Sequence, residues 1–351
     1  MRKRRRLMEA RLDEGSDGNS TEEANSSADT HAHGDPRDGK LHATAISTPP
    51  APSRPDMRAR PRRTRRALTL VAAALVCGAA TAAPAAATTV PSRTAAAGSG
   101  AQVKCTSDDN ALAHRLAQKV GGALRERHST AAVALYDRSS HTSCTYRAHT
   151  AFDSASVVKA TLLGALLRKA EEGHRKLTSE EKKRATAMIT ASDNDATTAL
   201  WHEVGLKGVQ HFLDLAGMKD TEPGRQGHWG LTQVTAQDQV KLLKLLTSGS
   251  HVLDAGSRGY ALDLMHKVTP SQRWGTPAGA PGDATVHVKN GWLSRDTHGW
   301  RINSIGAFTG RGHDYGIAVL SQDNKTMAYG VDTAESASRA IHHELAGRKA
   351  H

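Results

Sequence analysis

Aromatic residues are scarce in this sequence: Phe, Trp and Tyr together make up 4% of its 351 residues. The formal net charge is +12, but beyond residue 66 the basic residues are scattered along the chain. Proteins that bind nucleic acids carry clustered basic patches, and single-strand binders add stacking aromatic side chains. We therefore expect no nucleic-acid partner. The positive charge would instead suit transient association with an anionic cell-wall polymer or a membrane surface.

Cysteine is equally scarce, with three residues in the whole chain. Cys77 lies in an apolar, export-type stretch, which leaves Cys105 and Cys144 for the folded part. In an exported chain two cysteines can form one disulfide, but two unpaired thiols fit the sequence equally well. The 19 histidines show no ligand-like spacing, so we expect neither a metal nor another cofactor.

Large apolar residues are almost absent from residues 1–60, which predicts a disordered tail. The alternative is that the start of the protein is mis-assigned and that Met57 is the true first residue. Residues 61–87 combine arginines, a short apolar run and small residues, which is typical of a secretory signal; an uncleaved membrane anchor is the alternative. Residues 88–103 read as a linker. We expect one domain over 104–351 and a secreted or extracytoplasmic location.

Hydrophobic periodicity in 104–351 predicts a helix, two strands, a block of helices, three strands and a final helix. This order indicates an α+β fold: a five-stranded antiparallel sheet with the N- and C-terminal helices packed on it, plus an all-helical subdomain. The expected strands are 131–136, 145–147, 285–289, 301–305 and 315–320.

Ser156 and Lys159 stand at the start of a helix whose following residues are apolar nearly all round. Positions i and i+3 share a helix face, so the two side chains can touch. A lysine on a buried helix costs several kcal/mol unless it is paired or neutral. The arrangement favours a serine nucleophile that passes its proton to the lysine.

The same four-residue spacing recurs at Ser179 and Lys182, but there a role in starting a helix explains the residues better than a catalytic role. Thr178 and Glu181 form a capping-box pattern among charged neighbours, which predicts an exposed helix start. The Ser-x-x-Lys pattern alone therefore proves little.

Two further motifs follow in order: Ser192-Asp193-Asn194 in a turn between helices, and Lys289-Asn290-Gly291 at the end of a predicted strand. Together with the Ser156 pair, they resemble the motifs of the penicillin-binding and class A β-lactamase superfamily. The resemblance covers about residues 104–350, and its weight lies in the order and the structural context of the three motifs.

The resemblance implies a role for each motif residue. Ser156 would attack a carbonyl carbon, and Lys159 would act as its base. Ser192 would relay a proton to the leaving nitrogen. Asn194 would hold Lys159 and the amide of the substrate.

On the strand, Lys289 would supply positive charge for a substrate carboxylate. Asn290, followed by Gly291, stands where the family has a threonine hydroxyl that contacts this carboxylate, and its amide could still donate to it. The backbone N–H of Trp292 would complete an oxyanion hole with that of Ser156. Trp292 is larger than the residue usual after this motif, so we expect a reshaped substrate gorge.

One family motif is missing: no Glu-x-x-Leu-Asn segment, whose glutamate activates the deacylating water in class A enzymes, occurs here. Glu222, and after it His228, are the titratable residues that could replace it. We expect an exported serine hydrolase acting on β-lactams or related amides and esters as a monomer. A cell-wall D-Ala-D-Ala-type peptidase or transpeptidase is one alternative, and a penicillin-binding module without turnover is another.

Overall fold

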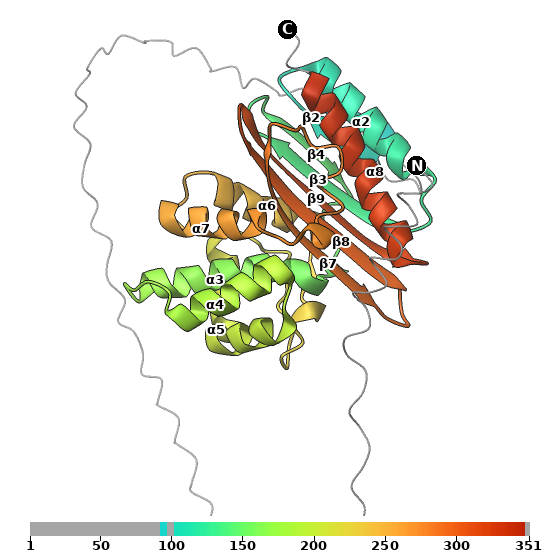
Figure 1. The fold of residues 1–351 in the computed structure, drawn as a ribbon. Helices are drawn as coiled ribbons and strands as arrows, with labels where there is room; N and C mark the ends of the chain where they lie inside the picture. Colours follow the sequence, from blue (N-terminus) through green and yellow to red (C-terminus); the bar gives the residue numbers. More distant parts are fainter. Residues whose placement is uncertain (1–91, 97–101, 348–351) are drawn as a thin grey trace, which may run out of the picture. The chain divides into compact units, whose positions relative to one another are not determined.

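The antiparallel sheet at the centre of the fold is seen in a computed structural model that describes residues 92–96 and 102–347 (Figure 1). Its seven strands run in the order β1-β2-β4-β3-β9-β8-β7. They are β1 (Ser92–Ala96), β2 (Gln102–Thr106), β3 (Thr130–Asp137), β4 (Thr142–Tyr146), β7 (Thr285–Ser294), β8 (Trp300–Gly310) and β9 (His313–Asn324). A separate two-stranded sheet pairs β5 (Phe152–Asp153) with β6 (Gln233–Val234).

Helices account for most of the remaining described residues. They are α2 (Asn110–Arg125), α3 (Val158–Glu172), α4 (Ser179–Thr186), α5 (Asn194–Leu215), α6 (Ala236–Thr247), α7 (Ala255–His266) and α8 (Met327–Ala346). Short turns of other helix types are η1 (Ala155–Val157), η2 (Ala187–Ala191), η3 (Trp229–Leu231) and η4 (Pro270–Gln272). Six helices begin at a side chain that accepts a backbone N–H: Asp109, Thr178, Asp193, Thr235, Asp254 and Thr326.

Both faces of the sheet are covered, and the alternation of side chains along its central strands explains why. On β3, Val133 and Leu135 join the apolar core beneath α2 and α8, whereas Ala134 and Tyr136 join the core shared with the helical block. Figure 1 shows α2 and α8 side by side on one face and α3 to α7 on the other. The predicted α+β architecture, with terminal helices on the sheet and a helical block, is confirmed.

The sheet is larger than predicted, with seven strands where the sequence indicated five. The two additional strands, β1 and β2, form a hairpin that includes residues we expected to be a linker between 88 and 103. β1 shows no apolar alternation in its sequence, whereas β2 does alternate, with Val103 and Cys105 buried between polar residues, a signal that the linker prediction missed. Cys105 on β2 lies opposite Cys144 on β4, and the two form a disulfide.

The predictions for residues 1–60 and for the signal or anchor at 61–87, including Cys77, lie outside the described residues. Within the described ranges, none of the helices combines the length and the apolar character that crossing a bilayer requires. No cluster of three or more His, Cys, Asp or Glu side chains suited to a metal ion occurs in these ranges either.

Candidate active site

Ser156 lies in the middle of η1, the tight turn that leads from β5 into α3. The residue before it, Ala155, has a φ of 46°, a conformation that costs a non-glycine residue roughly 1–3 kcal/mol. The turn is held from β8, where the buried Asn303 Nδ2 donates to the carbonyls of Asp153 at 2.9 Å and Ser154 at 3.0 Å. Tertiary contacts thus fix the backbone at the predicted nucleophile.

β7 passes so close to this turn that only a glycine fits at position 291. A Cβ on Gly291 would lie 2.6 Å from the backbone nitrogen of Ser156 and 2.9 Å from the carbonyl oxygen of Ser154. Both contacts are with backbone atoms, which cannot move aside as a side chain can. The glycine of the Lys-Asn-Gly motif therefore brings the strand against the predicted nucleophile.

Lys159, the second residue of α3, is fully buried and reaches the start of α5. Its Nζ donates to the Ser192 carbonyl at 2.5 Å, to Ser192 Oγ at 3.1 Å and to Asn194 Oδ1 at 2.9 Å. The first two motifs of the sequence are therefore joined by direct hydrogen bonds. Ser156 Oγ is not among these acceptors of the lysine.

Ser192 is placed by an irregular helix end. The helix that begins at α4 continues into the π-helical η2, and Ser192 follows it in the left-handed conformation with φ 60° and ψ 31°. Such π-helical turns are frequent at functional sites. Asp193 then caps α5 by accepting the backbone N–H of Ala196 at 2.7 Å, which leaves Ser192 at the junction between two helices.

Lys289 reaches Ser192 from β7. Its Nζ donates to Ser192 Oγ at 3.1 Å and to the Asn290 carbonyl at 2.9 Å, and its side chain is fully buried. Two lysine amines from different elements, Lys159 and Lys289, thus share the hydroxyl oxygen of Ser192.

Burial changes the protonation of both lysines. It lowers the pKa of Lys159 to about 7, against the opposing effect of the nearby Asp193 carboxylate. Burial, and after it the charge of Lys159, also hold the pKa of Lys289 well below its usual range. Two buried cations so close together repel each other, and a neutral lysine has a lone pair that can accept a proton. The site therefore holds an amine able to act as a base near neutral pH.

The side chain of Asn290 is turned toward the loop behind β7. Both of its hydrogen bonds go to backbone carbonyls, those of Gln272 at 2.8 Å and Trp274 at 2.9 Å, and the side chain is fully buried. Trp292 lies on the same side, with its ring centroid 6.0 Å from that of Trp274. The amide donors that we expected to face a substrate carboxylate are thus occupied within the protein.

Glu222, the first replacement considered for the missing glutamate, faces solvent. Its side chain is 68% exposed and forms an ion pair with Arg225, and its backbone pairs with Gln233. His228, the second, is also exposed. The structure brings neither of them into contact with Lys159 or Ser192.

Trp229 lies over Lys159 instead, a contact that no pattern in the sequence indicated. Its ring centroid is 4.8 Å from Lys159 Nζ, and its Nε1 donates to Thr198 Oγ1 at 3.1 Å. The loop that carries it is tied to the turn before α3, because Ser154 Oγ donates to the Gly230 carbonyl at 3.3 Å. No spacing rule links positions 159 and 229, so only the fold could reveal this contact.

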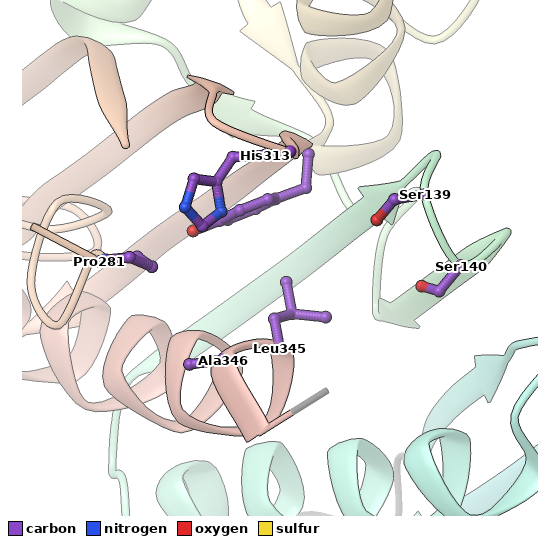
Figure 2. A pocket seen from close by; sticks show the side chains of 8 residues that line it. Ser139, Ser140, Pro281, His313, Leu345 and Ala346 are labelled. Atoms are coloured by element: carbon purple, nitrogen blue, oxygen red, sulfur yellow. The ribbon is translucent and has the colours of Figure 1, made fainter. Parts of the chain in front are cut away.

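A cavity of about 300 Å³ lies elsewhere, where α8 ends beside the turn between β3 and β4. Figure 2 shows Ser139 and Ser140 of that turn on one side and Leu345 and Ala346 of α8 on another, with His313 above them. None of the motif residues lines this cavity, so it is separate from the candidate site.

Three motifs on one α+β framework define the class of this protein, a serine hydrolase scaffold in which two buried lysines contact Ser192. The model of the beta-lactamase enzyme family matches residues 115–185 and 182–345 of this sequence. The chain belongs to that family.

Solved structures agree on the fold. The chain is similar to a class A beta-lactamase from Bacteroides cellulosilyticus, with a TM-score of 0.59 and 19% identity over 67% of this chain and 99% of that one. A beta-lactamase from Sphaerobacter thermophilus gives a TM-score of 0.57 at 20% identity, covering 65% and 96% of the two chains. One from Xanthomonas campestris gives 0.58 at 19%, covering 68% and 98%.

Among curated proteins, the chain is 28% identical over 160 residues to a protein named "Putative lipoprotein LppW" in Mycobacterium tuberculosis and Mycobacterium bovis. The match covers 44% of this chain and 51% of the relative. The chain thus spans about half the length of the curated relatives it matches.

Proposed function

We propose that this protein is an exported serine hydrolase that forms an acyl-enzyme on Ser156 with a β-lactam or a related amide or ester. The observation that carries the proposal is the convergence of Lys159 Nζ and Lys289 Nζ on Ser192 Oγ, each at 3.1 Å, beside the Ser156 turn. A base, a proton relay and a cation are the groups that acyl transfer to a serine needs.

In the acylation step, Ser156 Oγ attacks the substrate carbonyl carbon and its proton passes to neutral Lys159. The tetrahedral oxyanion would be held by the backbone N–H groups of Ser156 and Trp292, worth about 3–4 kcal/mol for each donor. As the carbon–nitrogen bond breaks, the leaving nitrogen takes a proton through Ser192, which Lys159 resupplies. A substrate carboxylate beside Lys289 would favour the protonated form of this lysine, whose pKa burial otherwise holds well below its usual range.

Release of the acyl group is the step of the proposed cycle for which the fewest residues are in place. The contacts of Glu222 are with Arg225 and Gln233, and the ring of Trp229 covers Lys159. Without a carboxylate to activate water, the ester on Ser156 would persist. This favours the second candidate function, a penicillin-binding module that captures its ligand and turns it over slowly.

An extracytoplasmic location fits the disulfide between Cys105 and Cys144, because such bonds persist mainly outside the reducing cytosol. The mycobacterial relative bears a lipoprotein name, which supports the same side of the membrane. We propose a small-molecule or cell-wall peptide substrate reached from that compartment.

Incubation with a fluorescent penicillin, followed by intact mass measurement, tests the proposal. We expect one covalent adduct on the wild-type protein and none on Ser156→Ala. The matched control is Ser179→Ala, in the second Ser-x-x-Lys of the chain, which should label fully. If Ser156→Ala labels like the wild type, the proposed nucleophile is wrong.

Turnover of a chromogenic cephalosporin separates the two candidate functions. A persistent adduct with little colour change supports a binding module, whereas rapid colour change with no adduct supports a hydrolase. If the wild type gives neither adduct nor turnover, the acyl-transfer proposal itself fails.

A further inference from the structure

The cavity of about 300 Å³ at the end of α8, shown in Figure 2, takes no part in the proposed acyl transfer. Its walls come from the turn between β3 and β4, the start of β9 and the last turn of α8. We call it the α8-end cavity. The polar side chains in its lining are those of Ser139, Ser140, His313 and Tyr315, and α8 contributes Leu345 and Ala346.

The two serine hydroxyls in the lining have already donated their hydrogens. Ser139 Oγ donates to Asp137 Oδ1 at 2.7 Å, and Ser140 Oγ donates to Asp137 Oδ2 at 2.9 Å. A hydroxyl has one hydrogen and a carboxylate only accepts, so these two oxygens can offer a ligand only lone pairs. Asp137 itself is fully buried, which places a negative charge behind the two serines.

The hydroxyl of Tyr315 is also an acceptor, because of its contact with the buried His342. His342 Nε2 lies 2.8 Å from the carbonyl oxygen of Thr276, which only accepts, so Nε2 carries a hydrogen. Burial lowers the pKa of His342 to about 4, so the ring is neutral and its Nδ1 has a lone pair. Tyr315 Oη, 3.0 Å from that Nδ1, therefore donates its hydrogen to His342.

The two remaining sides of the cavity also favour a donor. His313 Nε2 lies 2.8 Å from Asp283 Oδ1 and donates to it, which leaves Nδ1 of the neutral imidazole as an acceptor. α8 ends at Ala346, and the last carbonyls of a helix lack partners within the helix. The same end of a helix carries the negative pole of its dipole.

The permanent charges bonded directly to the lining side chains are the carboxylates of Asp137 and Asp283. Arg138, on the same turn as the two serines, does not line the cavity, because it pairs with Asp314. Arg311 precedes the lining residue Gly312 in the chain and does not line the cavity either. A ligand inside therefore meets acceptors backed by negative charge.

We propose that the α8-end cavity is a binding site for a guanidinium or alkylammonium group. Such a cation has only hydrogen-bond donors, so it complements a lining whose side chains are left with lone pairs. One source of the cation is the sequence itself, in which Arg348 and Lys349 follow Gly347, the residue after α8. The other source is a free ligand with a basic group. The inference is independent of the acylation of Ser156, because none of the motif residues lines this cavity.

Butylguanidinium and its neutral isostere butylurea form a probe pair that differs by one positive charge. The protein for this test is the full chain carrying both Arg348→Gln and Lys349→Gln, which removes the competing cations of the sequence. Nuclear magnetic resonance titration at constant ionic strength follows the ring signals of His313. We expect butylguanidinium to bind about tenfold more tightly than butylurea, as one charge-assisted contact would give. Equal binding of the two probes, or binding of neither, would overturn the inference.

Ser139→Ala, added to the same protein, tests the location of the site. It removes one acceptor from the lining and should weaken the binding of butylguanidinium about fivefold, with little effect on butylurea. Ser143→Ala is the matched control, because it removes a hydroxyl from β4 outside the lining. No loss in Ser139→Ala, or the same loss in both variants, would contradict the assignment of the cation to this cavity.

The wild type distinguishes the two sources of the cation. If Arg348 or Lys349 occupies the cavity, its tether gives it a high effective concentration. Butylguanidinium should then bind the wild type at least about tenfold more weakly than the double variant, and the double variant should have a lower melting temperature. Equal affinities in the two proteins would instead identify a free basic ligand as the occupant. Either result supports a cation site, provided that butylguanidinium binds the double variant more tightly than butylurea does.

Discussion

At the scale of single residues, the site depends on how two buried lysines share the hydroxyl of Ser192. Lys159 and Lys289 come from a helix and a strand, and each places its Nζ 3.1 Å from that oxygen. Desolvation lowers the pKa of both lysines, and the charge of Lys159 lowers that of Lys289 further. An amine that is ordinarily protonated can therefore serve as a base near neutral pH.

The first prediction concerns the pH dependence of acylation. Burial lowers the pKa of Lys159 to about 7, and only its neutral form, present above that pKa, can take the Ser156 proton. The rate constant for labelling by benzylpenicillin should therefore rise between pH 5.5 and 8, with a midpoint near the pKa of Lys159. Lys159→Arg, which stays protonated, should lose at least about 100-fold in rate. A flat profile in the wild type would exclude Lys159 as the base.

The second prediction concerns Trp229, whose ring lies over Lys159 Nζ. In Trp229→Ala, water reaches the amine and the ester, so the acyl-enzyme should decay roughly tenfold faster. Trp229→Phe retains an aromatic ring and should preserve a long adduct lifetime. The half-life is measured by intact mass after excess penicillin is removed. Equal half-lives in all three proteins would show that this ring does not control release.

At the scale of secondary-structure elements, the site is made where β7 packs against the turn that starts α3. The strand supplies Lys289 and Gly291, and the turn supplies Ser156, so the spacing between the two elements sets the geometry. Asn303 on β8 holds the turn in place. Because Gly291 has no side chain, the strand can lie directly against the turn.

The third prediction tests this spacing. In Gly291→Ala, the new Cβ would lie 2.6 Å from the backbone nitrogen of Ser156, so the strand or the turn must move. A displacement near 1 Å should lower the rate of labelling by about 100-fold. Gly122→Ala is the control, because nothing lies within 4 Å of its new methyl group and it is in the exposed part of a helix. That variant should label like the wild type, and equal labelling of Gly291→Ala would contradict the proposed fit.

At the scale of the whole described structure, the disulfide links strands β2 and β4 on the face of the sheet that α2 covers. Cys105 and Cys144 are 39 residues apart in sequence and lie opposite each other on paired antiparallel strands. The bond closes a loop containing α2 and β3, so it restricts the unfolded chain over a large part of the first half of the domain.

The fourth prediction follows from that loop. Replacing both cysteines with alanine should lower the free energy of unfolding by about 4 kcal/mol, the loop-entropy value for a closed segment of this length. Denaturant unfolding of the oxidised wild type, the reduced wild type and the double variant measures the change. Reductant should destabilise the wild type and leave the double variant unaffected. Identical unfolding curves for all three proteins would contradict a stabilising role for the bond.

Local signals in the sequence predicted much of the fold. Thr178 and Glu181 form the capping box that made the second Ser-x-x-Lys a helix start, with reciprocal hydrogen bonds of 2.6 and 3.1 Å. The three C-terminal strands, β7 to β9, were visible as alternation. β1 was not, because its residues carry no apolar alternation, and the short alternation of Val103 and Cys105 on β2 was missed.

The sequence alone determined the order of the three motifs and the element on which each one stands, because helix starts, turns and strand ends have local signatures. Only the tertiary structure decided what surrounds them. It placed Trp229 over Lys159, turned the Asn290 amide to the carbonyls of Gln272 and Trp274, and left Glu222 in solvent. These contacts join residues far apart in the chain, and the packing of helices against the sheet, which no local pattern encodes, decides which of them meet.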